Sequence, residues 1–191
     1  MEHRQSLAKP GRIAALAARI DRPIVLVGMM GVGKSSLGKR LASLLGFGFV
    51  DADEEIEKAA RMTIPEIFDQ HGEAYFRDGE RRVIARLMED SGARRVIATG
   101  GGAFCNAATR AEILEKGIAV WLDSDIDTLV DRTARKGNRP LLQGGNPREI
   151  LTSLRDERRE FYEQAPIHIM SGNGPHSDSL ERIVEGIEAW L

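Results

Sequence analysis

The feature that most constrains this chain is a glycine-rich stretch at residues 28–35, which reads GMMGVGKS and fits G-x-x-x-x-G-K-[ST]. An apolar run at residues 23–27 precedes it, and a helical pattern at residues 36–45 follows it. Strand, glycine turn and helix, in that order, are the context of a phosphate-binding loop. The glycines let successive backbone N–H groups turn toward a phosphate chain, and the helix start adds partial positive charge. The stretch therefore predicts a nucleotide site rather than a purely structural turn.

Two side chains at the end of this loop have the chemistry that a nucleotide triphosphate requires. Lys34 is expected to reach the β- and γ-phosphates, and the Ser35 hydroxyl is expected to ligate Mg²⁺. The backbone that surrounds the phosphates would come from Met30, Gly31, Val32 and Gly33.

The bulk composition excludes several classes of function. With 191 residues and a net charge of −2, the chain fits one domain and offers no basic field for nucleic acid. Its apolar runs are too short to span a bilayer. Cys105 is the only cysteine, so no disulfide can form within one chain, as is typical of a reducing compartment. We therefore expect a cytoplasmic monomer without nucleic-acid or membrane partners.

Residues 1–22 need a separate interpretation. Ile13, Leu16, Ala17 and Ile20 share one face of a possible helix. An Arg-rich, acid-poor start is also found in transit peptides, but this one is short and poor in serine. We expect residues 1–22 to form a surface helix or a frayed extension ahead of a single domain at residues 23–191.

Apolar runs alternate with helical patterns along the rest of the chain. Strands are expected at residues 23–27, 47–50, 95–98, 118–123 and 167–170. This alternation predicts a three-layer α/β fold, in which helices flank both faces of a five-stranded parallel sheet. Ligands of such sheets bind at the carboxyl ends of the strands. The glycine-rich loop, the Asp51–Asp53 segment, residues 100–102 and the turn after Met170 should therefore share one rim.

Two aspartates follow the second expected strand. A phosphoryl-transfer site needs one carboxylate for the metal shell and one for the acceptor hydroxyl, and Asp51 and Asp53 could serve both needs. Alternatively, one of them only caps the next helix. Asp123 follows an apolar strand, as in a Walker B segment, and is the rival for the metal. It ranks below Asp51, because a helix cap explains the polar residues after it.

Arginines recur on two expected helices, where a small anionic acceptor could be held. They are Arg77, Arg81, Arg82, Arg155, Arg158 and Arg159. The guanidinium fork matches a carboxylate substrate in a bidentate manner. The alternative is that these side chains are solvated or paired with glutamates, such as Arg77 with Glu73.

Two further segments favour ligand binding. Residues 100–102 are three successive glycines after a strand, which allow close approach of backbone to ligand or form a simple tight turn. Residues 135–147 lack an apolar period and contain Lys136, Arg139, three glycines and two prolines. This composition predicts a mobile lid, from which Arg139 could reach the γ-phosphate.

Taken together, these pieces resemble the shikimate kinase family, from Ile24 to nearly the C-terminus. The matching segments are residues 28–36, 51–53, 67–68, 72–73 with 76–77, 100–103 and 139–142, followed by Arg158 four residues before Tyr162, with Ala165 after it. No single segment is decisive, but their order and spacing are specific.

The resemblance implies a P-loop kinase fold and transfer of the γ-phosphoryl group of ATP to the 3-hydroxyl of shikimate, on the route to chorismate and the aromatic amino acids. It implies that Asp53 binds the acceptor hydroxyls and acts as base or orienter. Arg77 and Arg158 would hold the shikimate carboxylate. The backbone at Gly101 would bond a ring hydroxyl.

The resemblance also implies the groups around ATP and the metal. The loop ending in Lys34 would bind ATP, Ser35 would ligate Mg²⁺, and Asp51 would contact the ion through water. Arg139 would be the lid arginine. Pro175 is only the positional match for an adenine contact, because residues 171–175 lack the basic residues that the family often carries there.

Two other functions share part of this pattern. A gluconate or nucleoside monophosphate kinase would share the phosphate loop, but the Phe76-Arg77 pair and the three glycines argue against it. A GTP-dependent switch protein would explain Asp69-Gln70-His71-Gly72 as D-x-x-G. That segment falls inside a helical pattern, however, and no lysine is preceded by Asn or Thr as a guanine-reading box requires.

Overall fold

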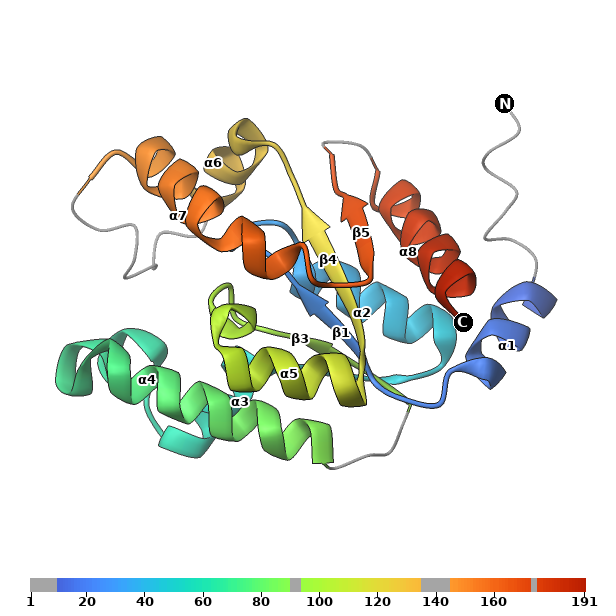
Figure 1. Cartoon of the computed structure of the whole chain (residues 1–191), viewed down its shortest axis with the longest axis horizontal. Helices are drawn as coiled ribbons and strands as arrows, with labels where there is room; N and C mark the ends of the chain where they lie inside the picture. Colours follow the sequence, from blue (N-terminus) through green and yellow to red (C-terminus); the bar gives the residue numbers. More distant parts are fainter. Residues whose placement is uncertain (1–9, 90–93, 135–144, 173–174) are drawn as a thin grey trace.

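Five parallel strands form the centre of the computed structural model, which describes residues 10–89, 94–134, 145–172 and 175–191. The strands are β1 (Ile24–Val27), β2 (Gly48–Asp51), β3 (Arg95–Ala98), β4 (Ile118–Asp123) and β5 (Ile167–Met170), in the spatial order β2-β3-β1-β4-β5 (Figure 1). All four pairings are parallel. The predicted five-stranded parallel sheet is confirmed.

The central strand β1 shows why the apolar runs became strands. Ile24 pairs with Val96 of β3 on one side and with Ile118 of β4 on the other. All four residues of β1 are fully buried. A parallel sheet covered on both faces has this continuous apolar character, because neither face of an inner strand meets water.

Helices cover both faces of the sheet (Figure 1). In chain order they are α1 (Pro10–Arg19), α2 (Lys34–Leu45), α3 (Ala52–Ala60), α4 (Ile64–Glu89), the short 3₁₀ turn η2 (Ala103–Cys105), α5 (Ala107–Lys116), α6 (Ile126–Ala134), α7 (Pro147–Tyr162) and α8 (His176–Trp190). Helices α2 and α8 pack on one face, with α1 beside them, whereas α4 and α5 cover the other. Helices α6 and α7 lie against each other near the carboxyl ends of the strands.

Helix α4 contains a break at Gly72. The backbone there has φ 79° and ψ 174°, so two helical segments meet at a kink. The first segment begins with a capping box, in which the Thr63 amide donates to Glu66 at 2.7 Å and the Glu66 amide donates to the Thr63 hydroxyl at 3.4 Å. The second segment carries Arg77 toward the sheet.

Helix α1 packs its apolar face into the core. Ile13, Leu16 and Ile20 are buried and belong to the main hydrophobic cluster. On the adjoining face, Arg12 forms ion pairs with Glu181 and Glu188 of α8, each at 2.6 Å. Over residues 10–20, this segment is therefore held by both apolar burial and ion pairs.

Length and apolarity together rule out a membrane-crossing helix among the residues that the structure describes.

Candidate active site

The turn between β1 and α2 forms a cradle of backbone amides. Gly33 is the N-cap of α2 and has φ 103°, a left-handed conformation that residues with a Cβ rarely adopt. Lys34 follows and is buried, and its Nζ donates to the carbonyls of Gly28 at 2.7 Å and Met29 at 2.9 Å. These bonds hold the lysine across the loop. The same lysine is expected to complete the phosphate cradle that the loop forms.

This cradle opens into a cavity of about 360 Å³ at the carboxyl ends of the strands. The residues that line it are Met30, Gly31, Gly33, Lys34, Ser35, Ser36, Asp51, Asp53, Thr99, Gly101, Arg132 and His176. The shared rim expected from the parallel topology therefore unites the glycine-rich loop, both aspartates and the triple-glycine turn. Val32, by contrast, is buried behind the loop.

Ser35, Asp51 and Asp53 are linked by direct hydrogen bonds. The Ser35 hydroxyl donates to Asp51 Oδ2 at 2.5 Å, and Asp51 Oδ1 accepts the Asp53 amide at 3.1 Å. Asp51 is therefore the N-cap of α3, as one alternative expected, and also the partner of the loop serine. A hydroxyl and a carboxylate side by side are hard oxygen ligands of the kind Mg²⁺ prefers.

Each glycine of the 100–102 turn faces a different polar group. A Cβ built on Gly100 would lie 2.4 Å from Glu80 Oε1 and 2.9 Å from Asp53 Oδ1. One on Gly101 would lie 3.1 Å from the Met30 amide, and one on Gly102 would lie 2.6 Å from Arg77 Nη1. The glycines leave room for the charged groups of the site, so the turn is more than a tight connection.

Arg77 is held in place by a buried glutamate. Its Nη1 donates to Glu80 Oε2 at 2.7 Å, while its Nη2 donates to Glu73 at 3.0 Å on the exposed side. Glu80 is only 3% exposed, and this burial raises its pKa, although Arg77 opposes the shift. The pairing of Arg77 with Glu73 that the sequence left open is present, yet the guanidinium still borders Gly102.

Arg158 of α7 reaches the same turn from the other side. Its Nη1 is buried, has no hydrogen-bond partner among the described residues, and would lie 3.5 Å from a Cβ on Gly101. One turn later on α7, the buried Tyr162 hydroxyl donates to the Gly101 carbonyl. Burial raises the pKa of Tyr162, so the phenol stays a neutral donor. A buried guanidinium nitrogen without a partner is suited to an anionic ligand.

Several residues of this site were not identified from the sequence. Glu80 was missed, although its spacing three residues after Arg77 is a signal for a helical ion pair. Arg132 connects the Val32 carbonyl at 3.2 Å with the Gly172 carbonyl at 3.0 Å, and so joins the loop to the turn after β5. His176 lines the cavity, and burial together with Arg40 and Arg132 lowers its pKa.

Other candidates lie elsewhere. Pro175 is the N-cap of α8 and does not line the cavity, although its neighbour does. Arg139 and residues 135–144 of the expected lid lie outside the described residues. Asp123 is also absent from the residues that line the cavity, and Arg155 binds its carboxylate. Arg81 and Arg82 pair with Asp78 at the surface.

The parallel sheet, the glycine-rich cradle with Lys34 and Ser35, and the adjoining carboxylates define a P-loop kinase. The family model described as shikimate kinase matches residues 30–188. A shikimate kinase of Novosphingobium aromaticivorans is 63% identical, with both chains covered completely. One from Caulobacter vibrioides is 52% identical over 90% of this chain and 85% of that one. The chain belongs to the shikimate kinase family.

Solved structures agree with this assignment. A shikimate kinase from Acinetobacter baumannii, in complex with shikimate, is 38% identical and superposes with a TM-score of 0.85, covering 91% of this chain and 97% of that one. A gluconokinase from Sinorhizobium meliloti, at 17% identity and a TM-score of 0.56, shares the fold alone. The family resemblance read from the sequence is therefore confirmed.

Proposed function

We propose that this protein transfers the γ-phosphoryl group of ATP to the 3-hydroxyl of shikimate, giving shikimate 3-phosphate and ADP for aromatic amino acid biosynthesis. The observation that carries the proposal is the convergence of two kinds of group on one turn. The phosphate cradle, Asp53 and the guanidinium groups of Arg77 and Arg158 all border residues 100–102.

In this reaction the protein mainly positions groups and neutralises charge, because the transferred phosphoryl passes through a loose transition state. Lys34 would leave the loop carbonyls and bind the β- and γ-phosphates. Asp53 would accept a hydrogen bond from the hydroxyl of the phosphoryl acceptor. It would act either as the base for that hydroxyl or only to orient it. Arg77 and Arg158 would hold the carboxylate at the far end of the ring, and the Gly101 backbone would bond a ring hydroxyl.

Magnesium fits the oxygen groups that face the phosphate cradle. Ser35 would ligate the ion, and Asp51 would contact it through water, since their oxygens already adjoin in the cavity. The ion would supply positive charge to the β- and γ-phosphates.

The nucleotide would extend from the cradle toward the turn after β5. Arg132 and His176 border that end of the cavity, so we place the rest of the nucleotide between them and the loop. Pro175 would then stand at the edge of the adenine site. Arg139, by family resemblance, would bind the γ-phosphate when the lid of residues 135–147 closes.

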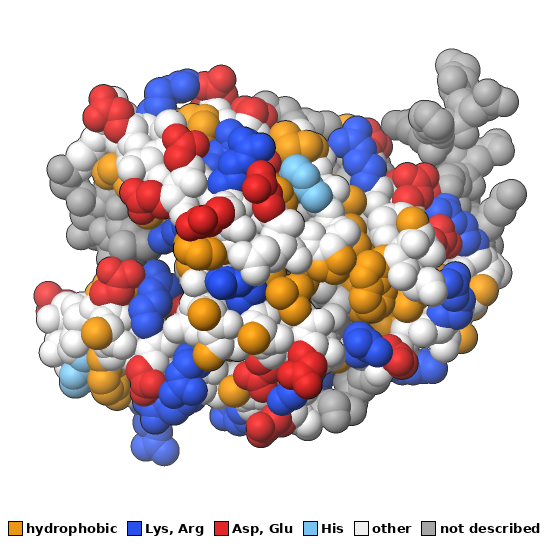
Figure 2. Space-filling view, in the orientation of Figure 1, with side chains coloured by type: hydrophobic (Ala, Val, Ile, Leu, Met, Phe, Trp, Pro, Cys, Tyr) orange, Lys and Arg blue, Asp and Glu red, His pale blue; other side chains and the backbone are white. Residues whose placement is uncertain are grey.

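The remaining assignments are part of the same proposal. We propose a cytoplasmic monomer that does not bind nucleic acid. On the face shown in Figure 2, Lys and Arg side chains are interspersed with Asp and Glu rather than gathered in one field. This distribution supports the proposal that the protein does not bind nucleic acid.

The test is to measure ADP formation with shikimate, gluconate and AMP side by side, and to identify the phosphorylated product by NMR. Shikimate-dependent ADP formation with phosphate on the 3-oxygen is expected. Turnover of gluconate or AMP without turnover of shikimate would contradict the proposal.

A further inference from the structure

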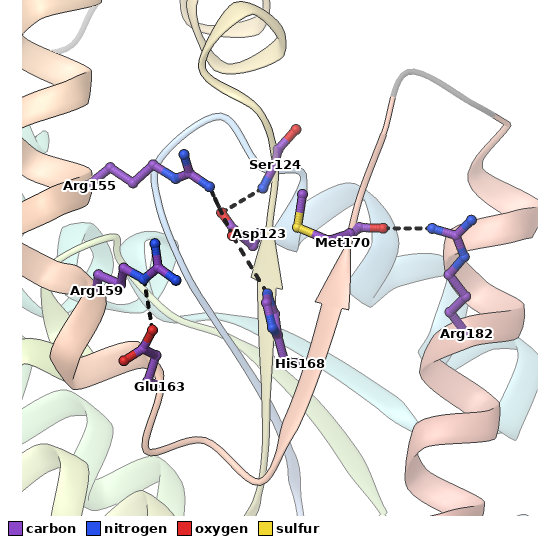
Figure 3. Close-up of polar contacts among 8 residues, drawn as sticks. All are labelled: Asp123, Ser124, Arg155, Arg159, Glu163, His168, Met170 and Arg182. Carbon is purple, nitrogen blue, oxygen red and sulfur yellow. Dashed lines mark hydrogen bonds and ion pairs between the residues drawn. The ribbon is translucent and has the colours of Figure 1, made fainter.

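Outside the cavity, a buried carboxylate ends the strand β4. Asp123 is 6% exposed, and its Oδ1 accepts the Ser124 amide at 2.8 Å. Arg155 Nη2 of α7 donates to Oδ2 at 3.1 Å and lies 3.4 Å from Oδ1. His168 Nε2 of β5 is 3.6 Å from Oδ2, too far for a hydrogen bond. Figure 3 shows Arg155 reaching from α7 to the end of the sheet.

The partner helix also carries a proposed substrate-binding arginine. Arg155, Arg158 and Tyr162 are spaced by three and then four residues, so they share one face of α7. Arg155 is fixed to Asp123 at one end of this face. Tyr162 is fixed to the Gly101 carbonyl at the other end, and its ring lies 5.9 Å from that of Trp121. Arg158 lies between these two attachments.

The position of Arg158 therefore depends on how α7 is rotated and shifted relative to β4. Its neighbour Arg159 is exposed and pairs with Glu163, the C-cap residue of α7, at 2.7 Å (Figure 3). Arg155 thus differs from the exposed Arg159, because it binds the buried carboxylate of Asp123 on another element. A displacement of about 1 Å at a charged contact can change a rate or an affinity substantially.

We infer that Asp123 and Arg155 are positioning residues, which hold α7 so that Arg158 meets the carboxylate of the acid substrate. This inference rests on the proposed function. In this scheme Asp123 serves as the partner of Arg155, and the metal role stays proposed for Asp51.

The test compares steady-state constants of Asp123→Asn, Arg155→Ala and Arg155→Lys with those of the unmodified protein. Asp123→Asn and Arg155→Ala should each raise the KM for shikimate roughly tenfold, with the KM for ATP within about twofold. Arg155→Lys, which keeps a cation near Asp123, should recover part of the loss. Arg159→Ala is the matched control and should leave both constants unchanged.

A double-mutant cycle separates positioning from a general structural effect. If Asp123 acts through Arg158, adding Asp123→Asn to Arg158→Ala should change the KM for shikimate by less than about twofold. Thermal unfolding and the KM for ATP report folding of each variant. An unchanged KM for shikimate in both Asp123→Asn and Arg155→Ala would overturn the inference, as would an undiminished effect in the Arg158→Ala background. If the unmodified protein did not phosphorylate shikimate at all, the proposed function would fail and the inference with it.

Discussion

At the scale of single residues, the charges of this site are placed by hydrogen-bonded partners. Asp53 stands at the start of α3, where the Asp51 carboxylate binds its amide. Glu80 fixes one edge of the Arg77 guanidinium and is buried against the triple-glycine turn. Such fixed charges need little reorganisation when a substrate arrives, which is how enzymes stabilise developing charge.

Asp53→Asn tests the proposed orienting carboxylate. The amide keeps the size of the side chain but lacks the charge with which the carboxylate accepts a hydrogen bond from the substrate hydroxyl. Turnover should therefore fall by about 10²–10⁴-fold. ADP binding, measured by calorimetry, should persist because the phosphate cradle is unchanged. Glu54→Gln, at the exposed neighbouring position, should behave as the unmodified enzyme. An active Asp53→Asn enzyme would rule out this role.

Arg158→Ala tests the buried guanidinium nitrogen that has no partner among the described residues. The change should weaken shikimate binding by about 1.5–3 kcal/mol, because it removes a charge-assisted contact. The dissociation constant can be measured by calorimetry in the presence of ADP. Arg159→Ala, on the exposed side of the same helix, should have no effect. A dissociation constant that does not move with Arg158→Ala would contradict the assignment.

His176 offers a test of where the nucleotide lies. Burial, with help from Arg40 and Arg132, lowers its pKa, so in the free protein the ring should lose its proton below the ordinary value of about 6.5. Bound phosphates favour the charged imidazole, and ADP should therefore raise this pKa. An NMR titration of the ring resonances measures both values. No response to ADP would show that the nucleotide lies elsewhere, and the ring of His71 on α4 serves as a spectroscopic control.

At the scale of elements, the site depends on close contact between a turn and two helices. The 100–102 turn follows β3, and its three glycines face Asp53 of α3, Glu80 and Arg77 of α4, and the Met30 amide. Helix α7 borders the same turn through Tyr162 and Arg158. Because these elements are distant in sequence, their packing rather than their local sequence determines the geometry.

Gly102→Ala tests this contact without backbone strain, since φ at Gly102 is −99°. The new Cβ would lie 2.6 Å from Arg77 Nη1 and displace the end of a flexible side chain. We expect the KM for shikimate to rise roughly tenfold with little loss of stability.

The matched control for this variant is Gly79→Ala in α4, where a Cβ meets nothing within 4 Å. Because alanine favours a helix interior over glycine, it should stabilise the protein by about 0.5–1 kcal/mol and leave the KM unchanged. Equal effects of the two substitutions on the KM would contradict the interpretation of the turn.

At the scale of the whole molecule, the first described helix contributes to the core on the face opposite α4 and α5. Leu16 is 1% exposed and packs in the main hydrophobic cluster, and Arg12 binds two glutamates of α8. The N-terminal and C-terminal helices are therefore fixed to each other, away from the cavity.

Leu16→Ala should lower the free energy of unfolding by about 2–4 kcal/mol, through lost apolar burial and the cavity left behind. Kinetic constants measured well below the melting temperature should stay the same, because the substitution lies far from the site. Denaturant unfolding measures the loss. Leu114→Ala, at a position 37% exposed, should cost much less. A small loss for Leu16→Ala would indicate that α1 is not part of the cooperative unit.

Features that depend on neighbouring residues could be predicted from the sequence. The phosphate loop and the strands are set by short-range spacing and apolar periodicity. The alternation of strands and helices predicted a parallel sheet. In such a sheet the carboxyl ends of the strands bring Asp51, Asp53 and the glycine turn to one rim. The family resemblance added shikimate-binding roles for Arg77 and Arg158 that spacing alone did not supply.

Only the tertiary structure decided which partner each charge meets. Six arginines on two helices looked alike in the sequence, yet packing turns Arg77 and Arg158 toward the glycine turn, Arg155 toward Asp123, and Arg81, Arg82 and Arg159 toward carboxylates on their own helices. The burial of Glu80 and of helix α1 was decided in the same way. The physical reason is that burial and ion pairing depend on distances between elements far apart in the chain, which no local pattern encodes.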